Sequence, residues 1–227
     1  MRPGQDKRDP HDPVHLHHPR RIYVLERNPE VRRVTRSERR LERIRSVLAR
    51  RQPGLTVVME NIHDPHNVSA VFRTSDAVGV VRIELLYTTE RFPSIGKKSS
   101  SSANKWLEVR KHRSISECYR TLRNEGFRIY ATRLGPASRS VYDLDLTRPV
   151  AFVLGNEHRG VSDQAAEGAD DIINIPMMGM IESLNVSVAT GVCLYEALRQ
   201  RLNAGLYTRC LLGDEALQRM VEEWAER

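Results

Sequence analysis

The chain has 227 residues, 40% of them hydrophobic, which is enough for a sizeable core in one main domain with small additions. No apolar run approaches the ~20 residues that cross a bilayer, and the polar start lacks a signal peptide's apolar stretch, so we expect a cytoplasmic protein without a membrane span. The cysteines form no CxxC pair, and we interpret all three as small buried apolar residues: Cys118, Cys193 and Cys210.

Positive charge is concentrated near the start of the chain. The formal net charge is +7 and the pI about 9.6. Segment 20–51 holds twelve arginines against four glutamates, an excess of eight positive charges. Such a density favours a polyanionic partner, because releasing counterions from phosphates drives binding. A solvated, disordered arm without a partner is the alternative.

We divide the chain into four parts. A flexible basic and His-rich leader spans 1–34, a basic helix 35–54, an α/β domain 55–205 and a C-terminal helical extension 206–227. The leader carries histidines that could bind a metal, although a disordered tail is the favoured interpretation: His11, His15, His17 and His18.

The predicted elements alternate between helices and strands. The first helix, 35–51, carries an apolar stripe facing inward and arginines mostly on the other face, and Pro53 and Gly54 end it. Strands are predicted at 55–62, 81–88, 106–112, 127–134, 149–155 and 171–177. Further helices are predicted at 68–79, 114–126, 162–169, 186–205 and 214–226, and a mobile loop at 90–104.

This alternation predicts an α/β fold with a mainly parallel sheet and helices on both faces. Ligands in such sheets usually bind beyond the carboxyl ends of the strands. Three polar loops lie at those ends, at 61–67, 155–160 and 178–185, so we expect the chemistry there.

Single residues in these loops give weak signals. In the first loop Asn67 is a good helix N-cap. By the three-and-four spacing rule, Arg73 shares a helix face with Ser69 and Asp76. Arg73 is therefore either a surface ion-pair partner or a group placed to hold a phosphate or a ribose hydroxyl.

The other two loops are equally ambiguous when read alone. Gly155 and Gly160 allow a sharp turn or a close approach of the backbone to a ligand, and Glu157 between them could accept a proton or hydrogen bonds. Asn185 is a plausible N-cap of the long helix. The glycine spacing fits neither a Rossmann nor a P-loop motif, and no zinc, HExxH, GxSxG or DxDxDG pattern occurs, so we expect no metal and no hydrolase.

Together, three stretches are far more specific. NIHDPHNVSAVFRTSDAVG, FVLGNEHRGVS and INIPMMGMIESLNVSVATGVCLYE resemble the three ordered motifs of the SPOUT 2'-O-methyltransferases. RRQPGLTVVMENIHDPHN and EALRQRLNAGLY are similar to the TrmH-type tRNA (guanosine-2'-O-)-methyltransferases within that superfamily. The resemblance covers roughly residues 38–225.

The resemblance implies a deep C-terminal trefoil knot within about 150–205, a rare exception among folds. It also implies a homodimer with active sites at the subunit interface, S-adenosylmethionine as methyl donor, and tRNA as substrate. The expected target is the ribose 2'-hydroxyl of the D-loop guanosine at tRNA position 18.

Residue roles follow from motif position. Arg73 matches the family's catalytic arginine. The other active-site positions are matched by Asn67, Glu157, Ser183 and Asn185. The residues that match the donor pocket are Thr132, Gly155, Ile175 and Leu184. RNA contact is implied for Arg43, and we extend it to the basic residues Arg39, Arg40 and Lys105.

The implied chemistry needs positioning and deprotonation of the ribose hydroxyl. Arg73, helped by an RNA phosphate, either orients and deprotonates the hydroxyl or only orients it and stabilises charge. A free arginine has a pKa above ~12, which makes it a difficult base. We expect Asn67, Ser183 and Asn185 to position the ribose and Arg73, and Glu157 to shape the pocket.

One stretch departs from the family pattern. Where relatives tend to carry a Gly-rich stretch, this chain has KKSSSSANKW at 97–106, which puts substrate choice more than activity in doubt. One alternative is a ribosomal RNA 2'-O-methyltransferase, which is less favoured because only a short arginine-rich segment precedes the domain. A second is an RNA-binding relative without catalysis, and a third an unrelated enzyme with a nucleic-acid-binding arm; the intact motifs argue against both.

Overall fold

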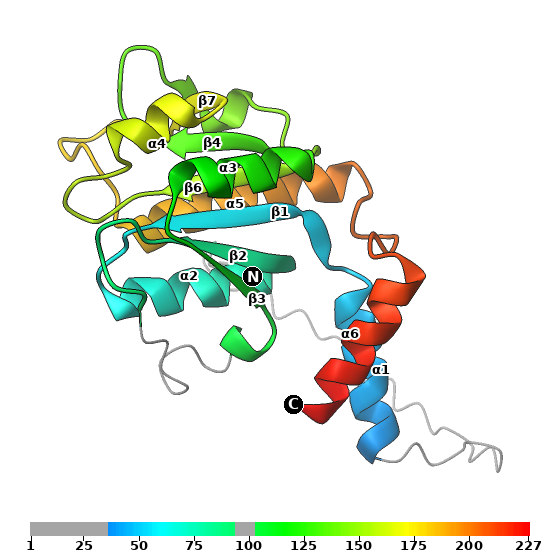
Figure 1. Ribbon diagram of the computed structural model, residues 1–227. Coiled ribbons are helices and arrows are strands. Elements are labelled where there is room, and N and C mark those ends of the chain that lie inside the picture. Colours follow the sequence, from blue (N-terminus) through cyan, green and yellow to red (C-terminus); the bar gives the residue numbers. More distant parts are fainter. Residues whose placement is uncertain (1–35, 94–102) are drawn as a thin grey trace, which may run out of the picture. The chain divides into compact units, whose positions relative to one another are not determined.

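The structure is a computed structural model, and it describes residues 36–93 and 103–227 (Figure 1). The predicted leader with its histidines, and residues 94–102 of the predicted loop, lie outside the described residues.

A seven-stranded sheet forms the centre of the fold, in the order β3-β2-β1-β6-β4-β7-β5. Every strand pair in it is parallel. The strands are β1 (Gln52–Glu60), β2 (Val80–Leu86), β3 (Glu108–His112), β4 (Arg128–Thr132), β5 (Arg139–Ser140), β6 (Val150–Leu154) and β7 (Asp171–Asn174). The prediction of an α/β fold with a mainly parallel sheet is therefore confirmed. The short strand β5 was not expected from the sequence. The prediction of three buried cysteines is wrong for Cys210, which is exposed, whereas Cys118 and Cys193 are buried.

Helices cover both faces of this sheet (Figure 1). The helices are α1 (Arg36–Leu48), α2 (Pro65–Ala77), α3 (Ile115–Asn124), α4 (Asp163–Gly168), α5 (Val186–Asn203) and α6 (Asp214–Glu226), with short 3-10 turns η1 (Ala103–Lys105) and η2 (Val141–Asp143). None of the described helices is long and apolar enough to span a membrane.

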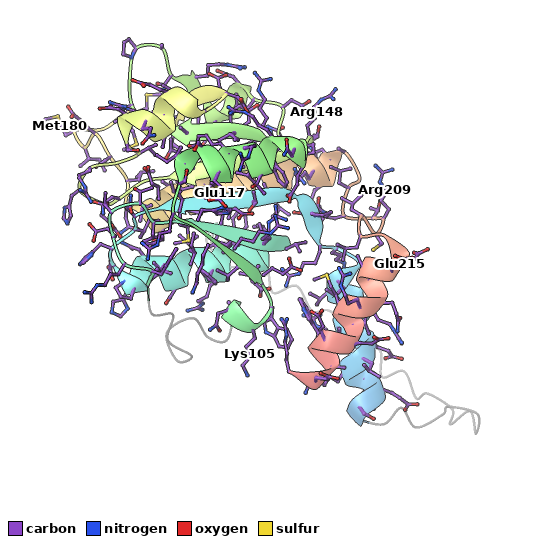
Figure 2. All side chains as sticks on the ribbon, viewed as in Figure 1. Lys105, Glu117, Arg148, Met180, Arg209 and Glu215 are labelled. Atoms are coloured by element: carbon purple, nitrogen blue, oxygen red, sulfur yellow. The ribbon has the colours of Figure 1, made fainter. Side chains whose placement is uncertain are left out.

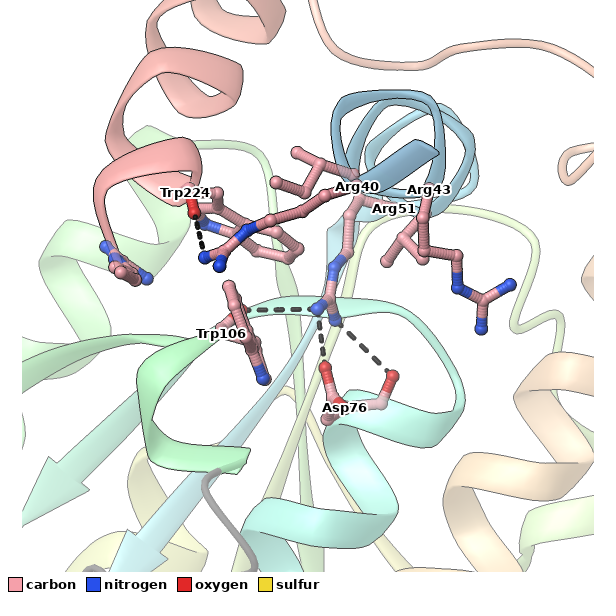
Figure 3. A pocket seen from close by; sticks show the side chains of 9 residues that line it. Arg40, Arg43, Arg51, Asp76, Trp106 and Trp224 are labelled. Atoms are coloured by element: carbon pink, nitrogen blue, oxygen red, sulfur yellow. Dashed lines mark hydrogen bonds and ion pairs between the residues drawn. The ribbon is translucent and has the colours of Figure 1, made fainter. Parts of the chain in front are cut away.

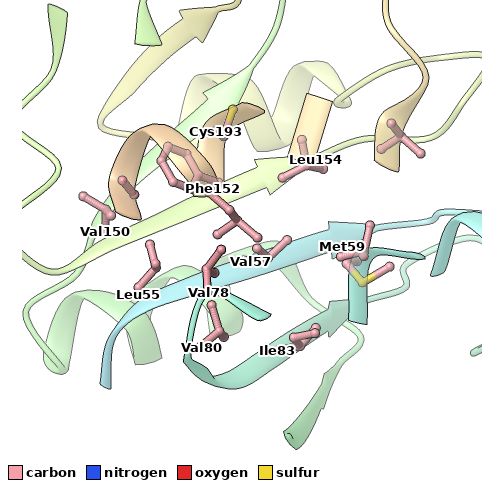
Figure 4. Close-up of a cluster of buried hydrophobic side chains, with 14 of the residues drawn as sticks. Leu55, Val57, Met59, Val78, Val80, Ile83, Val150, Phe152, Leu154 and Cys193 are labelled. Atoms are coloured by element: carbon pink, nitrogen blue, oxygen red, sulfur yellow. The ribbon is translucent and has the colours of Figure 1, made fainter. Parts of the chain in front are cut away.

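The strand residues alternate between two apolar layers, as the period of a strand requires. In β1, Val57 and Met59 belong to the layer that contains α2 and α5, whereas Val58 belongs to the layer under α3 and α4. Figure 4 shows the first of these layers, where Phe152 of β6 lies close to Cys193 of α5. Because both faces are buried, the central strands read as continuous apolar runs.

Helices α1 and α6, from opposite ends of the described chain, lie side by side and form a third, smaller core (Figure 1). Ile44 and Leu48 of α1 pack with Trp224 of α6, which confirms the predicted inward stripe. Pro53 and Gly54 were predicted to end the first helix, but α1 already ends at Leu48. They lie within β1, whose register shifts between Gln52 and Thr56, an irregularity that accommodates a proline without an N–H.

The start of α2 also differs from its prediction. Asp64, not Asn67, is the N-cap: its side chain accepts a hydrogen bond of 2.8 Å from the His66 N–H, and Pro65 occupies the first helical position. Asn67 therefore lies inside the first turn of the helix, where its side chain is free for contacts with other loops.

Candidate active site

The loops that follow β1 and β6 meet at the middle of the sheet, because these two strands are neighbours. Asn156 joins them: its Nδ2 donates 2.7 Å to the Asn61 carbonyl, and its Oδ1 accepts from the N–H groups of His158 and Arg159. Asn61 has φ 49°, in the left-handed region that asparagine tolerates better than most residues. These contacts fix the turn that carries Glu157.

Glu157 is the hub of this loop cluster. Its carboxylate accepts hydrogen bonds from the backbone N–H of His63 at 3.1 Å, from that of Asp64 at 3.2 Å and from Asn67 Nδ2 at 3.0 Å. Partial burial raises the pKa of Glu157, but these hydrogen bonds, with one from its own backbone, outweigh burial and hold the pKa below its ordinary value. The group is therefore an anionic acceptor that holds the first loop in place.

Asn185 connects the third loop to the same cluster. Its Nδ2 donates 3.1 Å to Asn67 Oδ1, and its own Oδ1 accepts from the Ser187 N–H at 2.8 Å. Asn185 is thus the N-cap of α5, as the sequence predicts. All three predicted loops are joined through Asn67, Glu157 and Asn185.

Two neighbouring cavities open beside this cluster. The larger, of about 600 Å³, is lined by Thr132, Gly155, Glu157 and the run 183–186. The smaller, of about 130 Å³, shares Thr132 and Leu184 with it and adds Ile175. The four residues predicted to contact the methyl donor therefore line one continuous region, and Ser183 and Asn185 lie at the same place.

Gly155 has no room for a side chain. A Cβ at this position would lie 2.1 Å from the carbonyl carbon of Gly160 and from the Val161 nitrogen, far inside contact distance. The turn after β6 can close only because Gly155 leaves its backbone bare, and that backbone forms part of the cavity wall.

A family model described as the SpoU rRNA methylase family matches residues 54–195, a span that contains both cavities. The chain belongs to this family. The family recognised from the sequence motifs is thereby confirmed.

Members of the SpoU family resemble the chain over most of its length. A tRNA (guanosine(18)-2'-O)-methyltransferase of Thermus thermophilus is 46% identical over 192 residues, which cover 85% of this chain and 98% of that protein. A crystal structure of the A. aeolicus TrmH/SpoU tRNA modifying enzyme superposes with a TM-score of 0.79 at 41% identity, covering 84% of this chain and 96% of that one. An AdoMet-bound rRNA methyltransferase from Sinorhizobium meliloti matches with a TM-score of 0.59 at 27% identity, over 69% of this chain and 59% of that one.

Arg73 stands apart from the other predicted residues of this SpoU-family site. Its side chain is exposed on α2, and it makes no hydrogen bond or ion pair with the residues that the structure describes. It lines neither of the two cavities. A single chain thus brings together Asn67, Glu157, Ser183 and Asn185, but leaves Arg73 outside the cavity.

The residues predicted to contact RNA lie in another part of the molecule. Arg40 and Arg43 of α1 line a separate pocket of about 540 Å³. Arg39 and Lys105 are exposed outside its lining. Over residues 36–93 and 103–227, no group of three or more His, Cys, Asp or Glu side chains is arranged to hold a metal ion.

Sequence reasoning missed Asn61 and Asn156, whose side chains shape the loops of this SpoU-family site. Both lie within two residues of a strand end, and asparagine commonly bonds nearby backbone groups at turns. This preference of asparagine for turns was the feature of the sequence that could have identified the two residues. The partner that each residue holds across the sheet was not visible in the sequence.

Proposed function

We propose that this chain transfers a methyl group from S-adenosylmethionine to the ribose 2'-hydroxyl of a guanosine in tRNA, at position 18 of the D-loop. The observation that carries the proposal is the cluster of Asn67, Glu157 and Asn185 beside the large cavity. The 46% identity to a tRNA (guanosine(18)-2'-O)-methyltransferase over 85% of the chain supports the choice of substrate.

The cavities fit the donor in size and chemistry. A volume of about 600 Å³ is typical of small-molecule sites. Bare backbone at Gly155 suits recognition of a nucleoside by main-chain groups, and the partly buried side chains of Ile175 and Leu184 offer apolar contact to its rings. When bound, S-adenosylmethionine supplies a methyl group activated by its attachment to a positively charged sulphur.

The residues of this chain then position the acceptor. As the bond from the ribose oxygen to the methyl carbon forms, the bond from that carbon to sulphur breaks and the hydroxyl proton leaves. Arg73 orients the hydroxyl and stabilises its developing negative charge, and it is the candidate to direct the proton to an RNA phosphate. Asn67, Ser183 and Asn185 hold the ribose side of the cavity, and Glu157 fixes their loops.

A second copy of the chain completes the site in this proposal. Helix α5 exposes Val188, Tyr195 and Leu202, each about half exposed and seven residues apart, so they form one stripe. Met180, in the loop before α5, is fully exposed (Figure 2). Contiguous exposed apolar side chains indicate a protein interface. A homodimer that covers this stripe would place the active sites at the interface, where Arg73 can take part.

We further propose the deep trefoil knot within about 150–205. Its support is the tight contact of Gly155 with Gly160 and Val161, next to the run 183–186 that lines the same cavity. The division into leader, basic helix, methyltransferase domain and helical extension stays a prediction. Action on tRNA would place the enzyme in the cytoplasm.

The test is a methyl-transfer assay with the full chain, labelled S-adenosylmethionine and unmodified tRNA transcript, followed by mapping of 2'-O-methylation. We expect label on the D-loop guanosine with the wild type and none with Arg73→Ala. Label on ribosomal RNA alone would mean that the substrate is ribosomal RNA and not tRNA. If the chain binds RNA but labels neither RNA, and calorimetry shows no donor binding, the chain is an RNA-binding protein without catalytic activity.

A further inference from the structure

A second pocket lies away from the methyl-donor cavities, between α1, α6, the end of α2 and η1 (Figure 3). We call it the α1–α6 pocket. It measures about 540 Å³ and has these lining residues: Arg40, Arg43, Ile44, Val47, Arg51, Asp76, Trp106, Trp224 and Arg227. Nothing in the proposed methyl transfer uses it.

Two aromatic rings form one wall of the α1–α6 pocket. The rings of Trp106 and Trp224 lie with centroids 4.9 Å apart, tilted by 54°. Trp224 is buried in the α1–α6 core, while Trp106 keeps part of its surface exposed. A partly exposed indole beside arginines is an arrangement on which the bases of single-stranded nucleic acid can stack.

The pocket carries positive charge mainly from Arg40 and Arg43, because Arg51 is paired with Asp76 and Arg227 with Glu223. It combines four arginines with one carboxylate, that of Asp76. Arg40 Nη2 donates to the Trp224 carbonyl at 3.5 Å, the outer limit of a hydrogen bond, and Arg43 makes no ion pair with any residue in the described part of the chain. Both guanidinium groups are exposed, on either side of Arg51 in the view of Figure 3. They are available for a phosphate.

Arg51 shows that the polar groups of the pocket are not fully satisfied. Its side chain is 1% exposed and is held by the Asp76 carboxylate at 2.5 Å, the Val80 carbonyl at 2.7 Å and the Trp106 carbonyl at 3.2 Å. Its Nε nevertheless has no hydrogen-bond partner among the described residues. A buried donor without an acceptor lowers stability, so the folded chain bears a cost at a residue that lines this pocket.

We propose that the α1–α6 pocket binds one unpaired nucleotide of the RNA, away from the nucleotide that is methylated. The base stacks on Trp106, and the phosphate lies between Arg40 and Arg43. The inference rests on the proposed function for the presence of RNA, and it adds a second recognition site to it. Asp76 lies one helical turn from Arg73 on α2, so the helix that carries Arg73 also lines this pocket.

Tryptophan fluorescence tests the proposal directly, since Trp106 and Trp224 are the two tryptophans of the whole chain. Unmodified tRNA transcript is titrated into the full-length protein, and S-adenosylmethionine alone serves as the comparison. We expect RNA to quench and shift the emission and the donor alone to leave it unchanged. Tight RNA binding, measured by filter retention, without a change in emission would overturn the proposal.

A pair of variants separates the pocket from general charge. Arg43→Gln removes a pocket arginine, and Arg45→Gln removes the same charge from an exposed position two residues along α1, outside the pocket lining. We expect Arg43→Gln to weaken tRNA binding about tenfold and Arg45→Gln to change it less than about twofold. Equal losses in the two variants would mean diffuse attraction and contradict the proposal.

Base stacking on Trp106 is tested with Trp106→Leu. Trp106→Phe is the conservative rescue, and a melting curve checks that each variant folds. We expect Trp106→Leu to raise the KM for tRNA about tenfold at unchanged kcat, and Trp106→Phe to restore most of it. A lowered kcat at unchanged KM would overturn the stacking role. If no methyl transfer occurs but the quench and its dependence on Arg43 persist, the proposed function fails and the pocket stands.

Discussion

The side-chain amides of Asn67 and Asn185 share a hydrogen bond of 3.1 Å, although 118 residues separate them along the chain. The orientation of both amides is determined by their neighbours. Asn67 must turn its Nδ2 toward the Glu157 carboxylate, which can only accept, and its Oδ1 therefore faces Asn185. The Asn185 oxygen in turn accepts from the Ser187 N–H at the start of α5. One polarised path runs from a carboxylate to a helix N-terminus.

Replacing the Asn67 donor by an acceptor should be more harmful than removing the side-chain amide altogether. Asn67→Asp places a second carboxylate against Glu157, whereas Asn67→Ala only removes the link. We expect kcat/KM for methyl transfer at pH 8 to fall about tenfold in the alanine variant and further in the aspartate variant. Lowering the pH toward 5 should recover activity in Asn67→Asp alone. Equal pH profiles for the two variants would contradict the arrangement, and Asn124→Asp on α3 is the matched surface control.

Glu157 should link stability to pH. Its pKa in the folded chain lies below the ordinary 4.5, so its contribution to the free energy of unfolding is complete above that value and is lost as the pH falls through the folded pKa. Urea midpoints of the wild type and Glu157→Gln should therefore differ at pH 7 and converge as the pH falls below the folded-state pKa of Glu157. Glu226→Gln, at the exposed end of α6, is the control, and its urea midpoint should match that of the wild type at every pH. A constant difference at all pH values would mean that packing, not charge, is affected.

Gly155→Ala tests whether the bare backbone shapes the donor cavity. The added methyl group would meet backbone of Gly160 and Val161, which has no flexible end to move aside. We expect the turn to shift, donor affinity measured by calorimetry to fall more than about tenfold, and the free energy of unfolding to drop by about 3 kcal/mol. The control is Gly213→Ala, where a Cβ meets nothing within 4 Å. Unchanged donor affinity in Gly155→Ala would sink this role.

Arg201 should be a structural anchor of α5. It is 2% exposed and donates to the carbonyl groups of Leu146, Gly54 and Arg148 and to the Gln52 amide oxygen. Removing it leaves several buried acceptors without donors, so Arg201→Met should lower the free energy of unfolding by about 3 kcal/mol or more, measured with urea. Arg201→Lys should restore only part, because lysine lacks the planar fork. Arg209→Met, at an exposed position after α5, should change little.

The apolar stripe of α5 should hold the dimer together. Tyr195→Asp places a charge in the middle of the stripe, and we expect monomers in sedimentation velocity runs and a loss of methyl transfer. Tyr142→Asp changes an equally exposed aromatic residue on η2 and should leave the oligomeric state unaltered. A Tyr195→Asp variant that sediments like the wild type would rule out this surface as the interface.

The order of strands and helices could be predicted because both faces of the sheet are covered, which gives apolar runs between clear turn residues. The first residue of a helix was harder to predict where two residues could each act as its N-cap. The stretch before α2 contains both Asp64 and Asn67, and the helix starts at the first because Pro65 follows it directly. The sequence pattern alone favoured Asn67, which proved to have a contact across the sheet instead.

The candidate site could be predicted as a set of loops but not as a geometry. Loops at neighbouring strand ends were expected to converge, and those carrying Asn67, Glu157 and Asn185 do. Asn61 and Asn156 were missed because their partners appear only when β1 becomes the neighbour of β2 and of β6. The position of Arg73 outside the cavity could not be predicted either, because the sequence does not determine where an exposed side chain lies before it binds a partner.

Helix α2 is fastened at both ends: Asn67 ties its first turn to Glu157 and Asn185, and Asp76 ties its last turn to Arg51. Arg73 stands between these two fixings. Folding has therefore already immobilised its backbone, and when Arg73 meets RNA the ordering cost is limited to the rotamers of one side chain, about 2 kcal/mol at most. The exposed Arg73 side chain can therefore change its rotamer to contact RNA while helix α2 stays in place.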